Sequence, residues 1–213
     1  MKKTTKDLSI CDKDVSAAMN KEQYCFAEEG WKHHLQQVYS FRFTETPVFT
    51  QKDGYITTAE NPNHRQGYDN ITMLSQKVYS AGVKATTHCA FDGSGCPALI
   101  MVKQPEECSD GAVRYGECFE IVLWKNGVNV WRHYMDADHK CRWHRRLEFK
   151  MPVQEKEIHR LEMLVEKDHI AFHLDGISAK LRAEDLFDTF YVGLNACEGI
   201  VRFYDLEIET LDG

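Results

Sequence analysis

The stretch Tyr115–Tyr134 reads YGECFEIVLWKNGVNVWRHY, with two runs of strand-forming residues on either side of Asn126-Gly127. An Asn-Gly pair between such runs predicts a β-hairpin with a two-residue turn. Counting outward from that turn places Glu120 directly opposite His133 on the neighbouring strand. Side chains alternate between the two faces of a strand, so one face of this hairpin is mainly apolar and the other is polar.

The polar face of the predicted hairpin also carries Trp124 and Trp131. Indole rings can stack on a sugar, while a carboxylate and an imidazole can bond to its hydroxyl groups. We therefore expect Glu120 and His133 to be a catalytic pair and the two tryptophans to bind substrate. Two alternatives stay open. Tryptophan is favoured in strands for packing alone, and a Glu–His pair on a sheet can simply be solvated. A shift of the turn by one residue would also exchange the two faces.

The rest of the chain repeats this strand pattern. Short alternating segments follow one another, with glycine-containing segments at 92–95 and 197–199 that predict turns. Such a pattern predicts an all-β fold, an antiparallel β-sandwich or barrel, with one or two short helices. The best helical candidate is Ala183–Asp188. We expect residues 1–30 to be an N-terminal extension packed on the domain, with a helical turn or two inside it, and residues 31–213 to be one β-sandwich domain.

Composition limits the class of protein. Of the 213 residues, 43% are hydrophobic and 28% are charged, which is ordinary for a globular chain, and the net charge of −7 argues against a nucleic-acid partner. No stretch approaches the roughly 18 apolar residues of a membrane span, and the basic start precedes no apolar run of a secretory signal. A cytoplasmic location follows as an expectation. The eight cysteines contain no Cys-x-x-Cys pair, so reduced thiols are expected.

The C-terminal third resembles a known family. It contains, in order, HIAFHLDG (169–176), AEDLF (183–187), FYVGLNACEG (190–199) and IVRFYDLEIE (200–209). This order resembles the last strands of concanavalin A-like lectin/glucanase domains, and also the bacterial domains linked to 3-keto-disaccharide hydrolysis. The resemblance covers about residues 155–211 well and 68–134 loosely. It implies a jelly-roll sandwich, a fold on which many different functions occur.

One departure from that family concerns the catalytic residues. Its glucanases carry a Glu-x-Asp-x-x-Glu strand, whereas the nearest strand here has only Glu117 and Glu120, which point to opposite faces. The pair of carboxylates that glycosidases hold about 5–5.5 Å or about 6.5–9.5 Å apart is therefore not evident. We expect a carbohydrate-active protein that binds or acts on a glycoside or oligosaccharide in the concave face, as a glycoside hydrolase or lyase. The alternative is a non-catalytic, lectin-like module.

Two further histidines are candidates for substrate binding. His88 precedes the segment 92–95 on the polar face of its strand, and we expect it to join Glu120 and His133 above one groove. His144 belongs to the basic strand Arg142–Arg146, which suits an acidic sugar or, alternatively, a charged sheet edge that prevents aggregation.

Histidine and cysteine are frequent enough to raise the question of a metal. The densest cluster is His139-x-Cys141-x-x-His144, beside Asp136 and Asp138. Zinc needs ligands that converge on one point, but Cys141 and His144 point to opposite faces of a regular strand. The sequence therefore predicts no metal and no cofactor.

Overall fold

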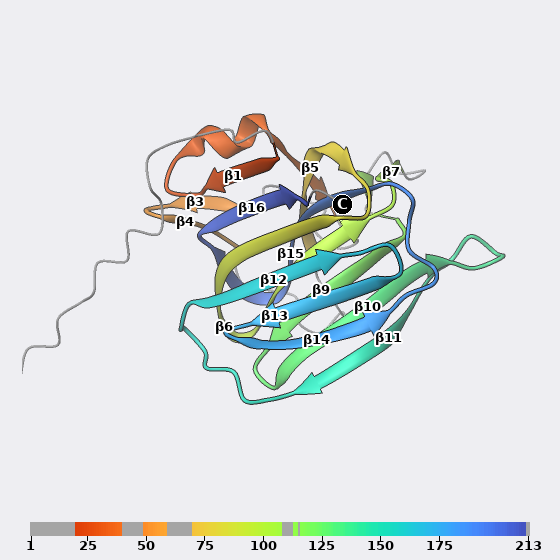
Figure 1. Cartoon of the computed structure of the whole chain (residues 1–213). Coiled ribbons are helices and arrows are strands. Elements are labelled where there is room, and N and C mark those ends of the chain that lie inside the picture. The colour runs from red at the N-terminus through yellow and green to blue at the C-terminus, as the bar shows by residue number, and fades with distance from the viewer. Residues whose placement is uncertain (1–19, 40–48, 59–69, 108–112, 115, 212–213) are drawn as a thin grey trace, which may run out of the picture.

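The computed structural model describes residues 20–39, 49–58, 70–107, 113–114 and 116–211. These residues form an antiparallel β-sandwich, and the predicted all-β class is confirmed (Figure 1). The bounds of the elements are β1 (Lys21–Cys25), η1 (Glu29–His33), β2 (Leu35–Tyr39), β3 (Thr50–Lys52), β4 (Tyr55–Thr57), β5 (Asn70–Tyr79), β6 (Val83–Val102), β7 (Glu106–Glu107), β8 (Val113–Arg114), β9 (Cys118–Trp124), β10 (Gly127–Met135), β11 (Cys141–Lys150), β12 (His159–Val165), β13 (His169–Leu174), β14 (Ile177–Arg182), β15 (Phe190–Phe203) and β16 (Asp205–Thr210).

Two sheets make up the sandwich. The first, called here the β9 sheet, has the order β11-β10-β9-β6-β15-β5-β2, using the second half of β6 and the first half of β15. The second, the β12 sheet, contains β14, β13, β12, the first half of β6, the second half of β15, β16 and β1. In Figure 1 strands β12–β14 lie over strands β9–β11. The long strands β6 and β15 therefore belong to both layers.

Glycines explain how β6 and β15 continue where turns were predicted at 92–95 and 197–199. A Cβ on Gly95 would lie 2.3 Å from the carbonyl oxygen of Ile200, and one on Gly199 would lie 2.6 Å from the Gly95 nitrogen. The two backbones approach closely here, with a register shift between Glu198 and Ile200. The turn predictions are wrong because these glycines lie at an irregularity in the pairing of two continuous antiparallel strands, as at a β-bulge.

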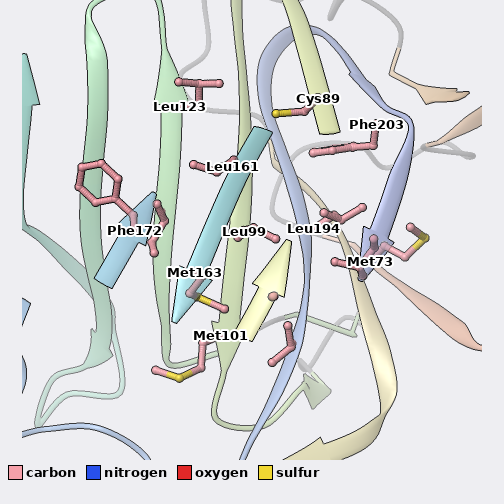
Figure 2. Packing of buried hydrophobic residues seen from close by; sticks show 14 of the residues in the cluster. Met73, Cys89, Leu99, Met101, Leu123, Leu161, Met163, Phe172, Leu194 and Phe203 are labelled. Carbon is pink, nitrogen blue, oxygen red and sulfur yellow. The ribbon is translucent and has the colours of Figure 1, made fainter. Parts of the chain in front are cut away.

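The main core lies between the two sheets (Figure 2). Leu161, Met163 and Phe172 come from the β12 sheet and meet residues of the β9 sheet such as Leu99 and Leu123; all five are at most 1% exposed. The opposite face of the β9 sheet carries a second, smaller apolar cluster, made of Leu74, Ile100, Val102 and Cys118 with Tyr191 packed against it. That second face, turned away from the main core, is called the outer face below.

The central hairpin forms, but its turn is displaced. Gly127 pairs with Trp124, so the two loop residues are Lys125 and Asn126 rather than Asn126 and Gly127. A Cβ on Gly127 would lie 1.9 Å from the carbonyl oxygen of Phe149, and its φ is +134°. The glycine is required by the close approach of β11 and not by the turn itself. Moving the two-residue loop by one position changes each cross-strand partner by two residues, so every side chain keeps its predicted face. The expectation that a one-residue shift of the turn would exchange the faces is therefore wrong.

The predicted helices differ from the structure. Residues Ala183–Asp188 are not helical, and the one helix among the described ranges is the 3₁₀ turn η1. Within the N-terminal segment, residues 1–19 lie outside the described residues. Lys21–Cys25 forms β1, paired with β16, where helical turns were expected. No helix within the described ranges is long and apolar enough to cross a membrane.

The cysteines meet the expectation of reduced thiols only in part. Free thiols occur at Cys89, Cys96, Cys118, Cys141 and Cys197. Cys25 is disulfide-bonded, so for that residue the expectation is wrong.

Candidate functional site

The site lies on the outer face of the β9 sheet, where β9 and β10 bring Glu120 and His133 together. The pairing places Glu120 opposite Trp131 and His133 opposite Cys118, so the predicted partners are diagonal neighbours instead of directly facing ones. His133 Nε2 nevertheless lies 3.1 Å from Glu120 Oε2. Diagonal positions on one face are within reach of long side chains, which is why the pair survives the displaced turn.

Glu120 is a buried carboxylate, with 3% of its surface exposed. Asn195, fully buried in β15, donates a hydrogen bond from Nδ2 to Glu120 Oε1 at 2.7 Å. Thr72, in β5, donates from Oγ1 to Asn195 Oδ1 at 3.0 Å. A hydrogen-bonded chain thus crosses the outer face from Thr72 to His133. Each oxygen of Glu120 has its own partner, as a buried charge requires.

The imidazole of His133 lies at the open end of this chain. Burial opposes a charge on this ring, but the negative charge of Glu120 and hydrogen bonds to Cys141 and Glu120 raise the pKa of His133 to about 10. The Trp143 ring stacks on it with centroids 6.4 Å apart. The exposed fraction rises from Glu120, through 13% for the His133 side chain, to 56% for Trp143. Access from solvent is therefore on the side of β11.

Aromatic residues flank the pair on the same face. Trp131 lies opposite Glu120 and is partly exposed, and the Arg145 guanidinium lies 5.7 Å from its ring centroid. Farther along the hairpin, Trp124 Nε1 and Asn129 Oδ1 are buried and have no hydrogen-bond partner among the described residues. An unpaired buried donor or acceptor is costly, so a donor and an acceptor left unpaired on one face are consistent with a polar ligand or bound water.

Cys118 adds a thiol to the same group. Its donor atom and those of Glu120 and His133 all lie within 4.8 Å of one another. Burial raises the pKa of the Cys118 thiol well above its ordinary value. A thiol, a carboxylate and an imidazole at this spacing are the donor types that divalent transition metals bind in proteins.

The structure does not bring His88 and His144 to this group. His88 lies in the first half of β6, in the β12 sheet, where its Nδ1 contacts Asp205 Oδ2 at 2.7 Å. The expectation that it shares a groove with Glu120 and His133 is wrong, because β6 passes from one sheet to the other between His88 and the site.

His144 is on the face of β11 opposite to the site. It pairs with Arg132 and contacts the Tyr134 ring edge-on, at 5.6 Å between centroids. Cys141, by contrast, is hydrogen-bonded to His133 on the site's side. The prediction that Cys141 and His144 point to opposite faces is confirmed.

Glu117 is not a second carboxylate for the site. It accepts a hydrogen bond from Arg132 Nη2 at 2.8 Å, and Arg132 also bonds Asp185 on the loop before β15. The Arg132 guanidinium lies 5.0 and 4.9 Å from the ring centroids of Phe119 and Phe187, which also contact each other. Arg132 thus holds Glu117 and Asp185 on the face of β10 opposite to His133.

Sequence reasoning missed Thr72, Cys118 and Asn195. Cys118 could have been found, because it is two residues from Glu120 and alternation places both on one face. Thr72 and Asn195 lie on strands distant in sequence, and nothing in the local pattern around them indicates that β5 and β15 extend the β9 sheet.

No family model matches this sequence, and no curated protein matches it. Solved structures do. A carbohydrate-binding module, CBM66 from Bacillus subtilis, matches with a TM-score of 0.58 at 16% identity, over 83% of this chain and 95% of that one. A glycoside hydrolase family 16 endo-glucanase from Bacteroides ovatus matches with 0.61 at 13%, over 88% and 99%.

The β-glucanase of Bacillus licheniformis gives a TM-score of 0.61 at 8% identity, over 89% of this chain and 98% of that one. These similarities establish the fold: the chain has a concanavalin A-like jelly-roll fold, as the resemblance of its C-terminal third implied. At these identities they extend to the fold alone.

Proposed function

We propose that this protein is carbohydrate-active and takes a glycoside or oligosaccharide on the outer face of the β9 sheet, where it acts as a glycoside hydrolase or lyase. The observation that carries the proposal is the buried Glu120–His133 pair with Trp131 and Trp143 beside it. Glu120 can accept a proton or hydrogen bond, His133 can donate one, and the indoles suit the apolar side of a sugar ring.

The unpaired Trp124 Nε1 and Asn129 Oδ1 add support, since a sugar hydroxyl can both accept and donate a hydrogen bond. The structural neighbours named as a glucanase and as a carbohydrate-binding module are compatible with catalysis and with binding alone. The alternative, a non-catalytic lectin-like module, is favoured by the lack of a second carboxylate on the outer face of strand β9. Its other outer-face positions, Cys118, Val122 and Trp124, hold no second carboxylate.

Tryptophan fluorescence of the full chain, titrated with a panel of oligosaccharides and aryl glycosides, tests binding. We expect quenching by at least one class of ligand. Trp131→Ala should weaken that binding at least tenfold, about 1.4 kcal/mol. Tyr134→Ala is the matched control, because Tyr134 is an exposed aromatic residue of the same strand on the opposite face. No quenching by any ligand, together with no product, would refute the proposal.

Product analysis on the same panel separates the two readings. If the protein is an enzyme, Glu120→Gln should lower turnover by about 10²–10⁴ while ligand binding persists. Binding without any product would favour the lectin-like alternative. A cytoplasmic location, with imported oligosaccharides or glycosides as ligands, stays a prediction.

A further inference from the structure

We propose that Cys118, Glu120 and His133 are the protein ligands of a zinc ion on the outer face of the β9 sheet. Their sulfur, oxygen and nitrogen donor atoms are mutually within 4.8 Å, and Cys118 and Glu120 are buried. The inference rests on the donor atoms alone and not on sugar binding, but it uses the same His133 and Glu120 atoms as the acid–base pair proposed above. A bound ion would occupy them, so they could not act as proton donor and acceptor while it is bound.

The donor set selects the kind of ion. Calcium and magnesium bind almost only to oxygen ligands, whereas a thiolate with an imidazole favours zinc and its neighbours among the transition metals. Zinc accepts Cys, His and Glu ligands within one site. On binding, the ion replaces the proton of the Cys118 thiol and one proton of the His133 imidazolium, and both protons pass to solvent.

The distances are close to those of a formed site. Two ligands about 2.1 Å from one ion at tetrahedral angles lie roughly 3.4 Å from each other. His133 Nε2 and Glu120 Oε2 are 3.1 Å apart, so this pair is already near that separation. Because no two of the donor atoms are more than 4.8 Å apart, the Cys118 sulfur needs to approach the other two by at most about 1.4 Å to reach that separation.

The backbone holds the three ligands on one face. Cys118 and Glu120 are separated by one residue of β9, so both point outward, and His133 is the direct cross-strand partner of Cys118. β9 is an interior strand of its sheet, paired with β10 on one side and β6 on the other. A site built on such strands is preorganised more firmly than one on loops.

A surrounding hydrogen bond orients the carboxylate ligand. Asn195 Nδ2 holds Glu120 Oε1, which leaves Oε2 directed at His133, and Thr72 in turn fixes Asn195. Metal-binding carboxylates are commonly held in this way, and removing such a partner typically costs about 10–100-fold in metal affinity. Asn195 is therefore a positioning residue in this proposal.

Three protein ligands leave one tetrahedral position for water or a bound molecule, as in catalytic rather than structural zinc sites. Solvent reaches this group past His133 and Trp143, which are more exposed than Cys118 and Glu120. An ion here would supply a Lewis acid on the outer face, beside the aromatic residues proposed to contact a sugar.

Cobalt(II) titration of the reduced, metal-stripped full chain tests the proposal. We expect one equivalent to bind, with a sulfur-to-cobalt charge-transfer band in the near ultraviolet, and one equivalent of zinc to displace it. Cys118→Ser should abolish that band. Cys89→Ser is the matched control, because Cys89 is an equally buried free thiol in the other sheet, and its band should equal that of the wild type.

Two further variants keep the test decisive if Cys118→Ser fails to fold. His133→Asn should lower cobalt affinity at least tenfold, and Asn195→Ala by about 10–100-fold with the charge-transfer band retained. Absence of a band in the wild type, a band undiminished in folded Cys118→Ser, or unchanged affinity in His133→Asn would each overturn the proposal. Sugar binding can fail while cobalt binding persists, so failure of the carbohydrate proposal and failure of the metal proposal are distinguished by these two measurements.

Discussion

Glu120 occupies a buried position on a sheet, and its two carboxylate oxygens contact His133 of β10 and Asn195 of β15. A buried polar group left without its partner costs about 1–3 kcal/mol. Asn195 is the central residue of the hydrogen-bonded chain from Thr72 to His133. Its amide nitrogen donates to Glu120, and its amide oxygen accepts from Thr72. Replacing Asn195 with an apolar residue therefore removes a hydrogen-bond partner from both the Glu120 carboxylate and the Thr72 hydroxyl.

Asn195→Ala should accordingly lower the free energy of unfolding by about 1–3 kcal/mol. Urea denaturation followed by circular dichroism measures the change. Asn126→Ala is the control, because Asn126 is exposed in the turn of the central hairpin, and its effect should stay within about 0.5 kcal/mol. Equal effects of the two substitutions would contradict the role assigned to Asn195.

His88 provides a second residue-scale prediction, in the β12 sheet. The hydrogen bond from its ring to Asp205 raises the pKa of His88 above its ordinary value of 6.5, against the effects of burial and of Arg160. The charged imidazole is thus favoured in the folded state. Its stabilising contribution is complete below about pH 6.5 and is lost as pH rises through the folded-state pKa.

The difference in unfolding free energy between the wild type and His88→Gln should therefore shrink between about pH 6 and pH 9. We expect a change of about 1 kcal/mol or less, since the His88 side chain is 30% exposed and water screens the pair. Urea midpoints at both pH values measure it, with His173→Gln as the control histidine. A difference that grows with pH would reverse the sign and refute the assignment.

At the scale of elements, the central hairpin separates what local sequence can predict from what it cannot. Alternation correctly placed Glu120 and His133 on one face, because the period of a strand is two. The turn was predicted one residue too late because Gly127 was taken as a turn residue. The structure shows that this glycine allows the close approach of β11 at Phe149. A glycine that is needed for a contact with another strand thus looks, in the sequence, like a glycine that is needed for a turn. No feature within the hairpin sequence distinguishes these two roles.

The irregular pairing of β6 with β15 gives an element-scale prediction. Gly95→Ala places a methyl group 2.3 Å from the carbonyl oxygen of Ile200, on backbone that cannot rotate away. Overpacking of this kind typically costs about 1–3 kcal/mol, and thermal unfolding should show it. Gly30→Ala is the control, because its added Cβ meets nothing within 4 Å. A Gly95→Ala variant as stable as the Gly30→Ala variant would mean that the strands do not approach as described.

For the whole molecule, the sequence was sufficient for the sandwich and insufficient for the assignment of strands to sheets. Repeated short alternating segments without amphipathic helices leave few architectures other than two packed sheets. Which segments share a sheet depends on long-range pairing, such as Asn195 with Thr72. For this reason His88 was assigned to the wrong sheet, and Asn195 was not recognised as part of the site.

The N-terminal segment allows a test of cooperativity across the molecule. Phe26, just after β1, is fully buried and contacts the Trp31 ring edge-on at 5.9 Å between centroids. Phe26→Ala should cost about 3–5 kcal/mol, the usual cost of removing a large core side chain. If the segment is part of one cooperative unit, the whole urea transition should move to lower concentration and remain single.

The urea transition of Phe26→Ala is followed by two probes to test whether it stays single. Far-ultraviolet circular dichroism reports on the sheets, and tryptophan fluorescence reports on the surroundings of the indole rings. We expect both transitions to coincide at the shifted midpoint. Val78→Ala is the control, since Val78 is 45% exposed, and its midpoint should stay near that of the wild type. If the circular dichroism midpoint stayed unchanged while only part of the fluorescence signal shifted, the segment would be an appendage that unfolds separately from the sandwich.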